Sequence, residues 1–310
     1  MASGIIRNFT ECLAMKRSSL ETRNEEALRR IPEFRSLDLA KTVHNSDFHS
    51  YRNKYPFFGY VDCMVKESEF VMFSNNDDII AQSFFWFGAE GYEPFSVGLF
   101  RELSKNCAVI FDIGAFTGLY SLCAASVNNR AAIVTFEPSR STWERAKVNF
   151  VANSYGSTID LRNIALGAEV GTIEFNHYRS PLVLQAGASY VRKGGKEIFS
   201  TEIVSVGIGD EVVSSLGGLD LVKLDVEGAE LSVLKGMKSS ISSYEPIFII
   251  EIEPTNFRDV LVFFEEMGYV LKYIDEEHSQ FLDCDAGADK VANFCAVSKT
   301  KIDLVPGFVL

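Results

Sequence analysis

Seven short apolar runs, separated by longer amphipathic stretches, follow one another from residue 108 to residue 298. Each run has the length of a strand and is bounded by turn-forming residues. The predicted strands are Ala108–Ile113, Ala131–Phe136, Ile159–Ile164, Leu219–Asp225, Ile247–Glu253, Tyr269–Ile274 and Asn293–Ser298. The predicted helices between them are Thr117–Val127, Thr142–Asn153, Ala229–Met237 and Asn256–Met267. Because the strands are apolar on both faces and alternate with helices, the pattern predicts an α/β fold with a mostly parallel sheet and helices on both faces.

Two local signals predict helix ends. The sequence Ser141-Thr142-Trp143-Glu144 matches a capping box, in which a hydroxyl and a carboxylate satisfy the free amides of the first turn. Gly268 follows the last predicted helix, where glycine commonly ends a helix in a left-handed conformation. We therefore expect one helix to start at the box and another to stop at this glycine.

The segment 167–209 interrupts the regular alternation. It contains two small predicted strands, Thr172–Phe175 and Glu202–Val206, around a loop rich in Gly, Ser and Tyr. Since it precedes the fourth core strand, it would lie beside the carboxyl ends of the sheet, where such folds bind ligands. We predict that this insertion forms a lid over the substrate.

The first 89 residues follow a different pattern. They begin polar and charged, with a short helix expected at Leu20–Arg30 and a break at Pro32, and continue into an aromatic-rich passage. We expect an N-terminal extension, helical and aromatic-rich, over residues 1–89, a main domain over 90–300 and an apolar tail over 301–310. The tail would dock on its own core or contact a second copy, so a homo-oligomer stays open.

Composition and charge narrow the function classes. The chain has 310 residues, of which 47% are hydrophobic, and a formal net charge of −12. The hydrophobic fraction suffices for a folded core, and the negative charge argues against nucleic acid as the main partner. No run approaches the ~18 apolar residues of a membrane span, and the first residues lack the apolar core of a secretory signal. We therefore expect a cytoplasmic protein without a membrane span.

A glycine-containing turn follows the first predicted strand, in the sequence FDIGAFTG at residues 111–118. Asp112 ends the strand, Gly114 allows a tight turn and close approach of a ligand to the backbone, and Gly118 lets the next helix pack closely. Phe116 stands where the dinucleotide-binding motif needs glycine. The turn therefore predicts a ligand site that differs from a dinucleotide site.

A second acid, Glu137, ends the next strand. In this place a carboxylate can hold both ribose hydroxyls of a nucleoside cofactor, although the dipole of the following helix could also account for it. Because the glycine array for a pyrophosphate is incomplete, the expected ligand lacks one. S-adenosylmethionine fits that description.

A third motif, LVKLDVEGAE at residues 221–230, runs from the fourth core strand into a helix. Lys223 and Asp225 alternate onto one face of the strand, and a buried lysine needs a carboxylate partner, either Asp225 or Glu251 of the next strand. Glu227 could act as a base or a metal ligand. Such oxygen donors also suit Mg²⁺, but we favour carboxylates satisfied by Lys223 and by helix amides, with no metal.

Together, these motifs resemble the FkbM family of S-adenosylmethionine-dependent methyltransferases. The resemblance rests on FDIGA-x-x-G, FEP at residues 136–138, VKLDVEGAE and IIE at residues 249–251, and extends over roughly residues 90–298. Asn149 and Asn153, which follow the second acid, also look like that family. Members usually have Asn in place of Phe116.

The resemblance implies a class I methyltransferase fold, which is Rossmann-like, with seven strands of which the last is antiparallel. It also implies a site for S-adenosyl-L-methionine. The implied cofactor residues are Asp112, Gly114, Gly118, Glu137, Asn163 and Ala165, and Glu93 lies just upstream of the first core strand. The implied activity is O-methylation of a hydroxyl on a sugar, a polyketide or another small natural product.

An alcohol acceptor needs a base at neutral pH, and a positioned base typically adds ~10²–10⁴ in rate. Asp225 is the first candidate, with Lys223 and Glu251 as its electrostatic partners and Glu227 as a second carboxylate. His177 in the insertion is a further candidate base.

Three alternatives stay open. An N-methyltransferase would use the same cofactor without a strong base. A methyltransferase-like binding protein would keep the pocket but lack turnover. An NAD(P)-dependent oxidoreductase would keep the nucleoside site, but the absent central glycine counts against it.

Overall fold

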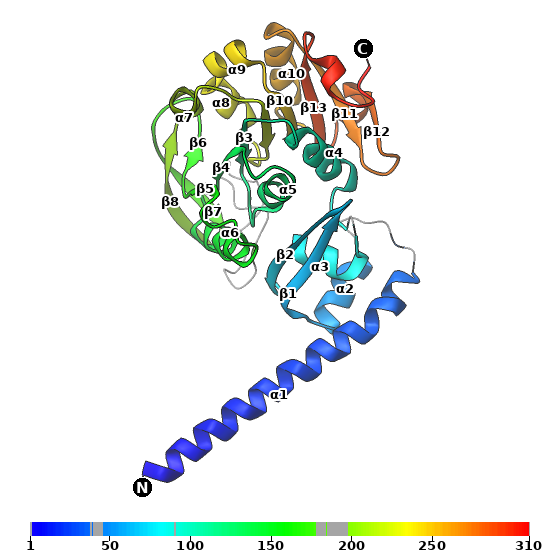
Figure 1. Ribbon diagram of the computed structural model, residues 1–310, viewed down its shortest axis with the longest axis vertical. Coiled ribbons are helices and arrows are strands. Elements are labelled where there is room, and N and C mark those ends of the chain that lie inside the picture. Colours follow the sequence, from blue (N-terminus) through cyan, green and yellow to red (C-terminus); the bar gives the residue numbers. More distant parts are fainter. Residues whose placement is uncertain are drawn as a thin grey trace.

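The computed structural model describes residues 2–37, 39, 46–89, 91–177, 184 and 198–309, with side chains from residue 19 onward. Within them, an eight-stranded sheet in the order β12-β11-β13-β10-β9-β3-β4-β5 forms the centre, and helices cover both of its faces (Figure 1). Its strands are β3 (Val109–Ile113), β4 (Ala132–Phe136), β5 (Ile159–Arg162), β9 (Leu221–Leu224), β10 (Ile247–Ile252), β11 (Tyr269–Asp275), β12 (Gln280–Asp283) and β13 (Ala292–Ser298). The predicted α/β fold and all seven predicted strands are confirmed.

The strand directions agree with the sequence-based expectation, but the number of strands does not. β5, β4, β3, β9 and β10 are parallel neighbours, and β13 is antiparallel to both β10 and β11. The expected count of seven strands is wrong, because β12 pairs with β11 in an antiparallel hairpin at the edge of the sheet. β12 is short and partly exposed, so no apolar run marks it in the sequence.

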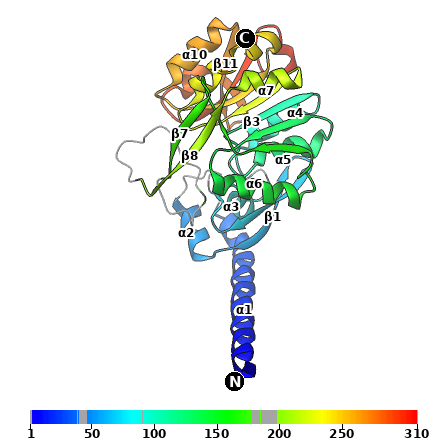
Figure 2. The ribbon, with the colours of Figure 1, turned by 90° about the vertical axis from the view of Figure 1, so that its left-hand side faces the viewer.

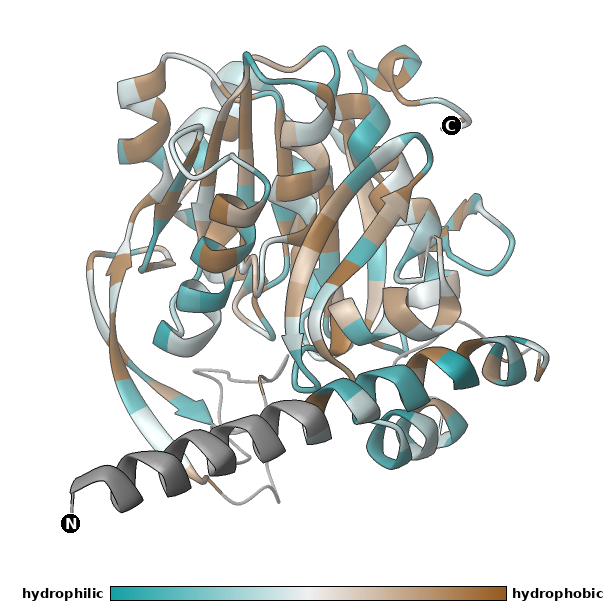
Figure 3. Ribbon diagram, turned by 60° about the horizontal axis from the view of Figure 1, so that its bottom comes forward, coloured by the Kyte–Doolittle hydropathy of each residue, from teal (hydrophilic) through white to brown (hydrophobic). Residues whose placement is uncertain are grey.

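Alternate residues of each strand pack into two different cores. Ile110 and Leu221 belong to the core that also holds residues of α4, α5 and α6, whereas Phe111 and Val222 belong to the core that holds residues of α7 to α10. These helices are α4 (Pro94–Ser104), α5 (Leu119–Val127), α6 (Arg140–Ala152), α7 (Gly209–Leu216), α8 (Glu230–Lys235), α9 (Lys238–Tyr244) and α10 (Phe257–Glu266). In Figure 3 the central strands carry the brown of apolar residues, as burial on both faces requires.

The helix ends agree with one of the two predicted signals. Helix α6 begins at Arg140 after the N-cap residue Ser139, so the predicted capping box is wrong. The Thr142 hydroxyl donates instead to Glu137 Oε1 (2.7 Å), and Glu144 pairs with Arg140 (2.8 Å). Gly268 follows α10 with a φ of 80°, which confirms the predicted stop.

A long helix opens the chain and projects away from the rest of the molecule (Figure 1). It is α1 (Ala2–Arg35), so the helix expected at Leu20–Arg30 is longer and the break expected at Pro32 is wrong. Contacts outside the helix hold the turn after the proline: Arg35 Nε donates to the Trp86 carbonyl (3.0 Å), and the Phe34 ring packs 5.3 Å from that of Trp86. No described helix is both long enough and apolar enough to span a membrane.

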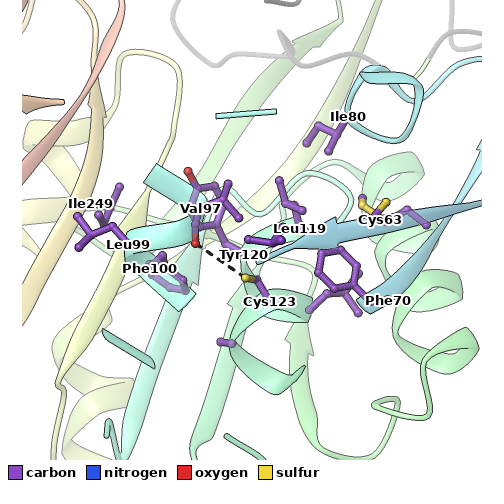
Figure 4. Packing of buried hydrophobic residues seen from close by; sticks show 14 of the residues in the cluster. Cys63, Phe70, Ile80, Val97, Leu99, Phe100, Leu119, Tyr120, Cys123 and Ile249 are labelled. Atoms are coloured by element: carbon purple, nitrogen blue, oxygen red, sulfur yellow. Dashed lines mark hydrogen bonds between the residues drawn. The ribbon is translucent and has the colours of Figure 1, made fainter. Parts of the chain in front are cut away.

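The described residues 46–89, which we call the N-terminal unit, combine helices with a hairpin. They form α2 (Ser46–Lys54), the antiparallel strands β1 (Phe58–Val65) and β2 (Ser68–Asn75), and α3 (Ile79–Phe87). Figure 4 shows Cys63, Phe70 and Ile80 of this unit near Leu119 and Cys123 of α5, in one continuous hydrophobic cluster. The domain boundary at residue 89 stays a prediction, but the apolar core runs across it.

The insertion forms a second, three-stranded sheet. Its strands are β6 (Ala165–Leu166), β7 (Gly171–His177) and β8 (Ser200–Gly207), in the order β6-β8-β7. β7 and β8 form an antiparallel arm at one side of the molecule (Figure 2), which confirms the two small strands predicted there. Most of the residues between the two strands, 178–183 and 185–197, lie outside the described residues, so the role of the insertion as a lid stays a prediction.

The apolar tail docks on the chain's own core. Val305 and Phe308 are buried, and the Phe308 ring lies 5.2 Å from that of Phe281 in β12. Of the two roles expected for the tail, the structure therefore shows the intramolecular one.

Candidate functional site

A cavity of about 1310 Å³ lies at the carboxyl ends of β3, β4, β9 and β10. Its wall has three parts: the loops that follow these strands, the N-terminal unit together with Tyr92, and the three-stranded sheet. Pockets for one small molecule usually hold about 300–1,000 Å³. The cavity is therefore large enough for a cofactor and a second ligand together.

The loop after β3 is held between the neighbouring strand ends. Gly114 has a φ of 79°, its N–H donates to the Phe136 carbonyl (2.9 Å), and a Cβ built on it would overlap the Asp225 carbonyl oxygen. Phe116 has a φ of 52°, a left-handed conformation that is uncommon for a bulky residue, and its N–H donates to Glu137 Oε2 (2.8 Å). This conformation requires glycine at position 114, and at position 116 it is stabilised by the hydrogen bond to Glu137.

The first acid, Asp112, is 1% exposed and lines the cavity. Its Oδ2 accepts hydrogen bonds from the Ser121 N–H (2.9 Å) and from the Ser121 hydroxyl (2.6 Å). Burial raises the pKa of Asp112 to about 6, although these hydrogen bonds and the nearby Lys223 favour the ionised form. Asp112 is thus a fixed, charge-bearing acceptor at the end of β3.

The second acid, Glu137, lines the same cavity from the end of β4. Its Oε1 accepts from the Ser139 N–H (2.9 Å) and the Thr142 hydroxyl (2.7 Å), while Oε2 accepts from Phe116. Burial raises the pKa of Glu137 to about 7 against these hydrogen bonds. Two acids from neighbouring strands therefore flank the glycine loop inside one cavity.

Lys223 is the buried cation of the site, with 2% of its surface exposed. Its Nζ donates to Asn293 Oδ1 (2.9 Å), lies 3.5 Å from Asp225 Oδ2 and sits 5.0 Å from the ring centre of Tyr120. Burial alone would lower the pKa of Lys223, but nearby carboxylates, Asp225 first among them, raise it. Lys223 therefore stays charged and pairs with Asp225, one of the two carboxylates predicted as its partner.

Glu251 adjoins this pair at the end of β10, opposite Asn293 in the strand register. Burial and the Asp225 charge raise the pKa of Glu251 well above its usual range, and Lys223 opposes that shift. Tyr92 lines the cavity nearby, and burial likewise raises the pKa of its phenol. Glu251 thus binds a proton more tightly than an ordinary glutamate. The Asp225 side chain, by contrast with the buried Lys223, is 26% exposed.

Eight of the twelve residues predicted for the site line this cavity: Asp112, Gly114, Glu137, Ala165, Lys223, Asp225, Glu227 and Glu251. The other four, Gly118, Glu93, Asn163 and His177, lie outside its lining.

Two of these four residues support the wall from behind. Gly118 precedes α5 with a φ of 91°, and a Cβ there would overlap the Phe150 ring, so its role is packing between helices. The Glu93 carboxylate accepts a hydrogen bond from the Tyr120 hydroxyl (2.6 Å) and so holds the ring that lies beside Lys223.

The other two residues have protein partners at the edge of the site. The Asn163 amide donates to the carbonyls of Glu137 (2.9 Å) and Pro138 (2.8 Å), so it shapes the turn after β4. The His177 ring lies on the β7–β8 arm, 3.3 Å from Glu202. A catalytic role for His177 would need contact with the cavity, which the described residues do not show.

Sequence reasoning missed the wall that the N-terminal unit provides. His49, Arg52 and Asn53 of α2 line the cavity, as do Ile79 and Ile80 at the start of α3. The three α2 residues have the i, i+3, i+4 spacing of one helix face. That spacing could have been found in the sequence, but no helix was predicted around it.

No group of three or more His, Cys, Asp or Glu side chains in the described residues is arranged to hold a metal ion. The carboxylates at the ends of β9 and β10 instead surround Lys223.

Comparison with known proteins points to one family. A profile of the Methyltransferase FkbM domain matches residues 112–271, about half of the chain. A hexuronic acid methyltransferase of Haloferax volcanii is 30% identical over 159 residues, which are 50% of this chain and 60% of that protein. A methyltransferase of Sordaria araneosa is 28% identical over 188 residues, 52% of this chain and 73% of that protein.

Among solved structures, an FkbM methyltransferase from Methylobacillus flagellatus is similar with a TM-score of 0.43 and 16% identity. The match covers 88% of this chain and 60% of that one. The chain thus spans 60% of the length of the Haloferax volcanii and Methylobacillus flagellatus proteins.

Proposed function

The chain belongs to the FkbM methyltransferase family, and from this premise we propose that it transfers a methyl group from S-adenosylmethionine to a hydroxyl oxygen of a small acceptor. Asp112 and Glu137 carry the proposal, because they flank the glycine loop from neighbouring strand ends inside one cavity. The name of the Haloferax volcanii relative supports a sugar-type acceptor for this chain.

The donor set fits an adenosyl sulfonium. The Glu137 carboxylate would accept hydrogen bonds from the ribose hydroxyls, and Asp112 would face the methionine end beside Gly114. Ala165 and Phe136 would border the adenine, since both line the cavity. When bound, S-adenosylmethionine supplies an electrophilic methyl group.

The acceptor would lie against the ends of β9 and β10. Asp225 is the proposed base, since its carboxylate is partly exposed to the cavity and Lys223 holds it in place. It would take the proton of the acceptor hydroxyl, a step that typically adds ~10²–10⁴ in rate. Glu227 and Glu251 line the same side and would orient the acceptor.

The N-terminal unit would form the opposite wall of the acceptor site. His49, Arg52 and Asn53 offer hydrogen-bonding groups there, and Ile79 and Ile80 offer an apolar surface. Such a mixture of polar groups and apolar surface suits a ring that carries several hydroxyls.

Calorimetry with S-adenosylhomocysteine tests the cofactor site. The wild type should bind, and Asp112→Ala should bind at least about tenfold more weakly, as expected for a lost charge-assisted hydrogen bond of ~1.5–3 kcal/mol. Asp303→Ala, which removes an exposed carboxylate outside the cavity lining, serves as the control. A wild type that does not bind S-adenosylhomocysteine would contradict the proposal.

Mass spectrometry then tests the reaction. Sugars and hexuronic acids are incubated with S-adenosylmethionine and the protein, and one methylation adds the mass of one CH₂. Asp225→Asn should keep its affinity for S-adenosylhomocysteine and lose turnover. An Asn variant with wild-type turnover would remove Asp225 from the mechanism.

A further inference from the structure

One buried side chain connects the N-terminal unit to the loop that follows β3. Asn149 of α6 is fully buried. Its Oδ1 accepts from the Phe73 N–H of β2 (2.8 Å), and its Nδ2 donates to the Thr117 carbonyl (2.9 Å). A single amide therefore bridges a strand outside the matched residues 112–271 and the loop beside the proposed cofactor site.

Asn153, one helical turn later, makes similar bonds without reaching the loop. Its Oδ1 accepts from the Val71 N–H (2.8 Å), and its Nδ2 donates to the carbonyls of Val71 (2.7 Å) and Asn149 (2.8 Å). The two asparagine side chains thus hydrogen-bond to main-chain groups along β2, as the backbone of a neighbouring strand would. Only Asn149 extends this pairing to the loop.

Arg145 adds a third attachment between α6 and the N-terminal unit. Its guanidinium forms a two-point ion pair with Asp77 (2.9 and 3.0 Å) and donates to the Phe73 carbonyl (3.0 Å). Both side chains are nearly buried, at 12% and 11% exposure. The N-terminal unit is therefore fixed to α6 at Arg145 as well as at the two asparagines.

The loop needs such support because its backbone is strained. Gly114, Phe116 and Gly118 all have positive φ values, and Phe116 has a side chain that disfavours this conformation. The Asn149 bond fixes the carbonyl of Thr117, the residue directly after Phe116. In the same turn, the Phe116 N–H donates to Glu137, the proposed ribose-binding acid.

We propose that Asn149 is a positioning residue, through which the N-terminal unit holds residues 114–118 in the conformation that binds the cofactor. This inference rests on the proposed function. The cofactor site would then depend on a segment that lies outside the residues matched by the family profile. Asn149 itself would not touch the cofactor, because it is absent from the cavity lining.

A matched pair of variants tests the inference. Asn149→Asp keeps an oxygen for the Phe73 N–H but replaces the donor to Thr117 with an acceptor, so the carbonyl is repelled. Asn153→Asp makes the same chemical change at the C-cap of α6, in a residue that bonds to the same hairpin but not to the loop. Calorimetry with S-adenosylhomocysteine should show a loss of affinity of about tenfold or more for Asn149→Asp and less than about threefold for Asn153→Asp.

Thermal unfolding of both variants provides the structural readout, because a merely structural role would lower affinity in proportion to stability in both. Equal losses of affinity in the two variants, or wild-type affinity in Asn149→Asp, would overturn the inference. Hydrogen exchange at the Phe116 amide needs no ligand, and it should become faster in Asn149→Asp alone. If the wild type does not bind S-adenosylhomocysteine, the proposed function fails, and the exchange rate still decides whether Asn149 holds the loop.

Discussion

Replacing Gly114 by alanine should destabilise the protein more than the same change at Gly217 does. Gly114 has a φ of 79°, and a Cβ on it would overlap the carbonyl oxygen of Asp225. Gly217, which ends α7, has nearly the same φ of 75° but open space around the added atom. The pair therefore separates the cost of the backbone conformation from the cost of the overlap.

The structure gives the magnitude. A left-handed conformation costs an L-residue roughly 1–2 kcal/mol, and this cost applies to both substitutions. Relief of the overlap requires a shift of the backbone, and overpacking of this kind typically costs about 1–3 kcal/mol. We expect Gly217→Ala to lower the free energy of unfolding by about 1–2 kcal/mol and Gly114→Ala by about 2–5 kcal/mol.

Urea denaturation followed by circular dichroism measures both free energies, and calorimetry with S-adenosylhomocysteine adds a functional readout. Because the overlap displaces the main chain of Asp225, Gly114→Ala should also weaken binding, whereas Gly217→Ala should not. Equal losses of stability in the two variants would refute the argument, since they would mean that the contact with Asp225 imposes no constraint.

Two further predictions follow from the buried charges. The pKa of Glu137 is raised to about 7, and only the ionised carboxylate offers a full negative charge to ribose hydroxyls. The affinity for S-adenosylhomocysteine should therefore fall as the pH drops from 8 to 5.5. Calorimetry across this range measures the affinity, and an affinity that does not change with pH would count against Glu137 as the ribose-binding acid. Lys223→Met leaves Asp225 and Glu251 without their cation and should lower the free energy of unfolding by about 3–5 kcal/mol. This loss should be larger at pH 8 than at pH 5.5, because removal of Lys223 raises the pKa of Glu251 further. A carboxyl whose pKa is higher in the folded than in the unfolded protein makes the protein less stable as the pH rises. Urea denaturation at both pH values measures the loss, and a larger loss at pH 5.5 would contradict this account.

The core sheet was predictable because each of its strands is locally distinct. The runs at Val109–Ile113 and Ile247–Ile252 are apolar on both faces, and burial in a parallel sheet requires this pattern. Asp112, Glu137 and Asp225 were predictable for a related reason, because an acid at the end of an apolar strand has a position fixed by the strand itself. Their hydrogen-bond partners, such as Asn293 for Lys223, come from distant segments and leave no local signal.

The N-terminal unit was not predictable in the same way. Pro32 argues locally for a helix end, but burial of Phe34 against Trp86 outweighs that preference. The strands of the hairpin have one buried face each, and their aromatic residues hide the alternation in the sequence. Its cavity-lining residues, His49 among them, can be recognised as part of the site only in the folded chain, where α2 lines the same cavity as the loops that follow the core strands.

The continuous hydrophobic cluster also bears on how the protein is made. Trp86 leaves the ribosome before Val305 and Phe308, which belong to the same cluster and lie about 220 residues later in the chain. At about 5–20 residues per second, synthesis of the intervening chain takes about 10–45 s. During that time the part of the cluster that is already synthesised lacks the packing of Val305 and Phe308, so we expect the nascent chain to need chaperone protection until Phe308 has emerged.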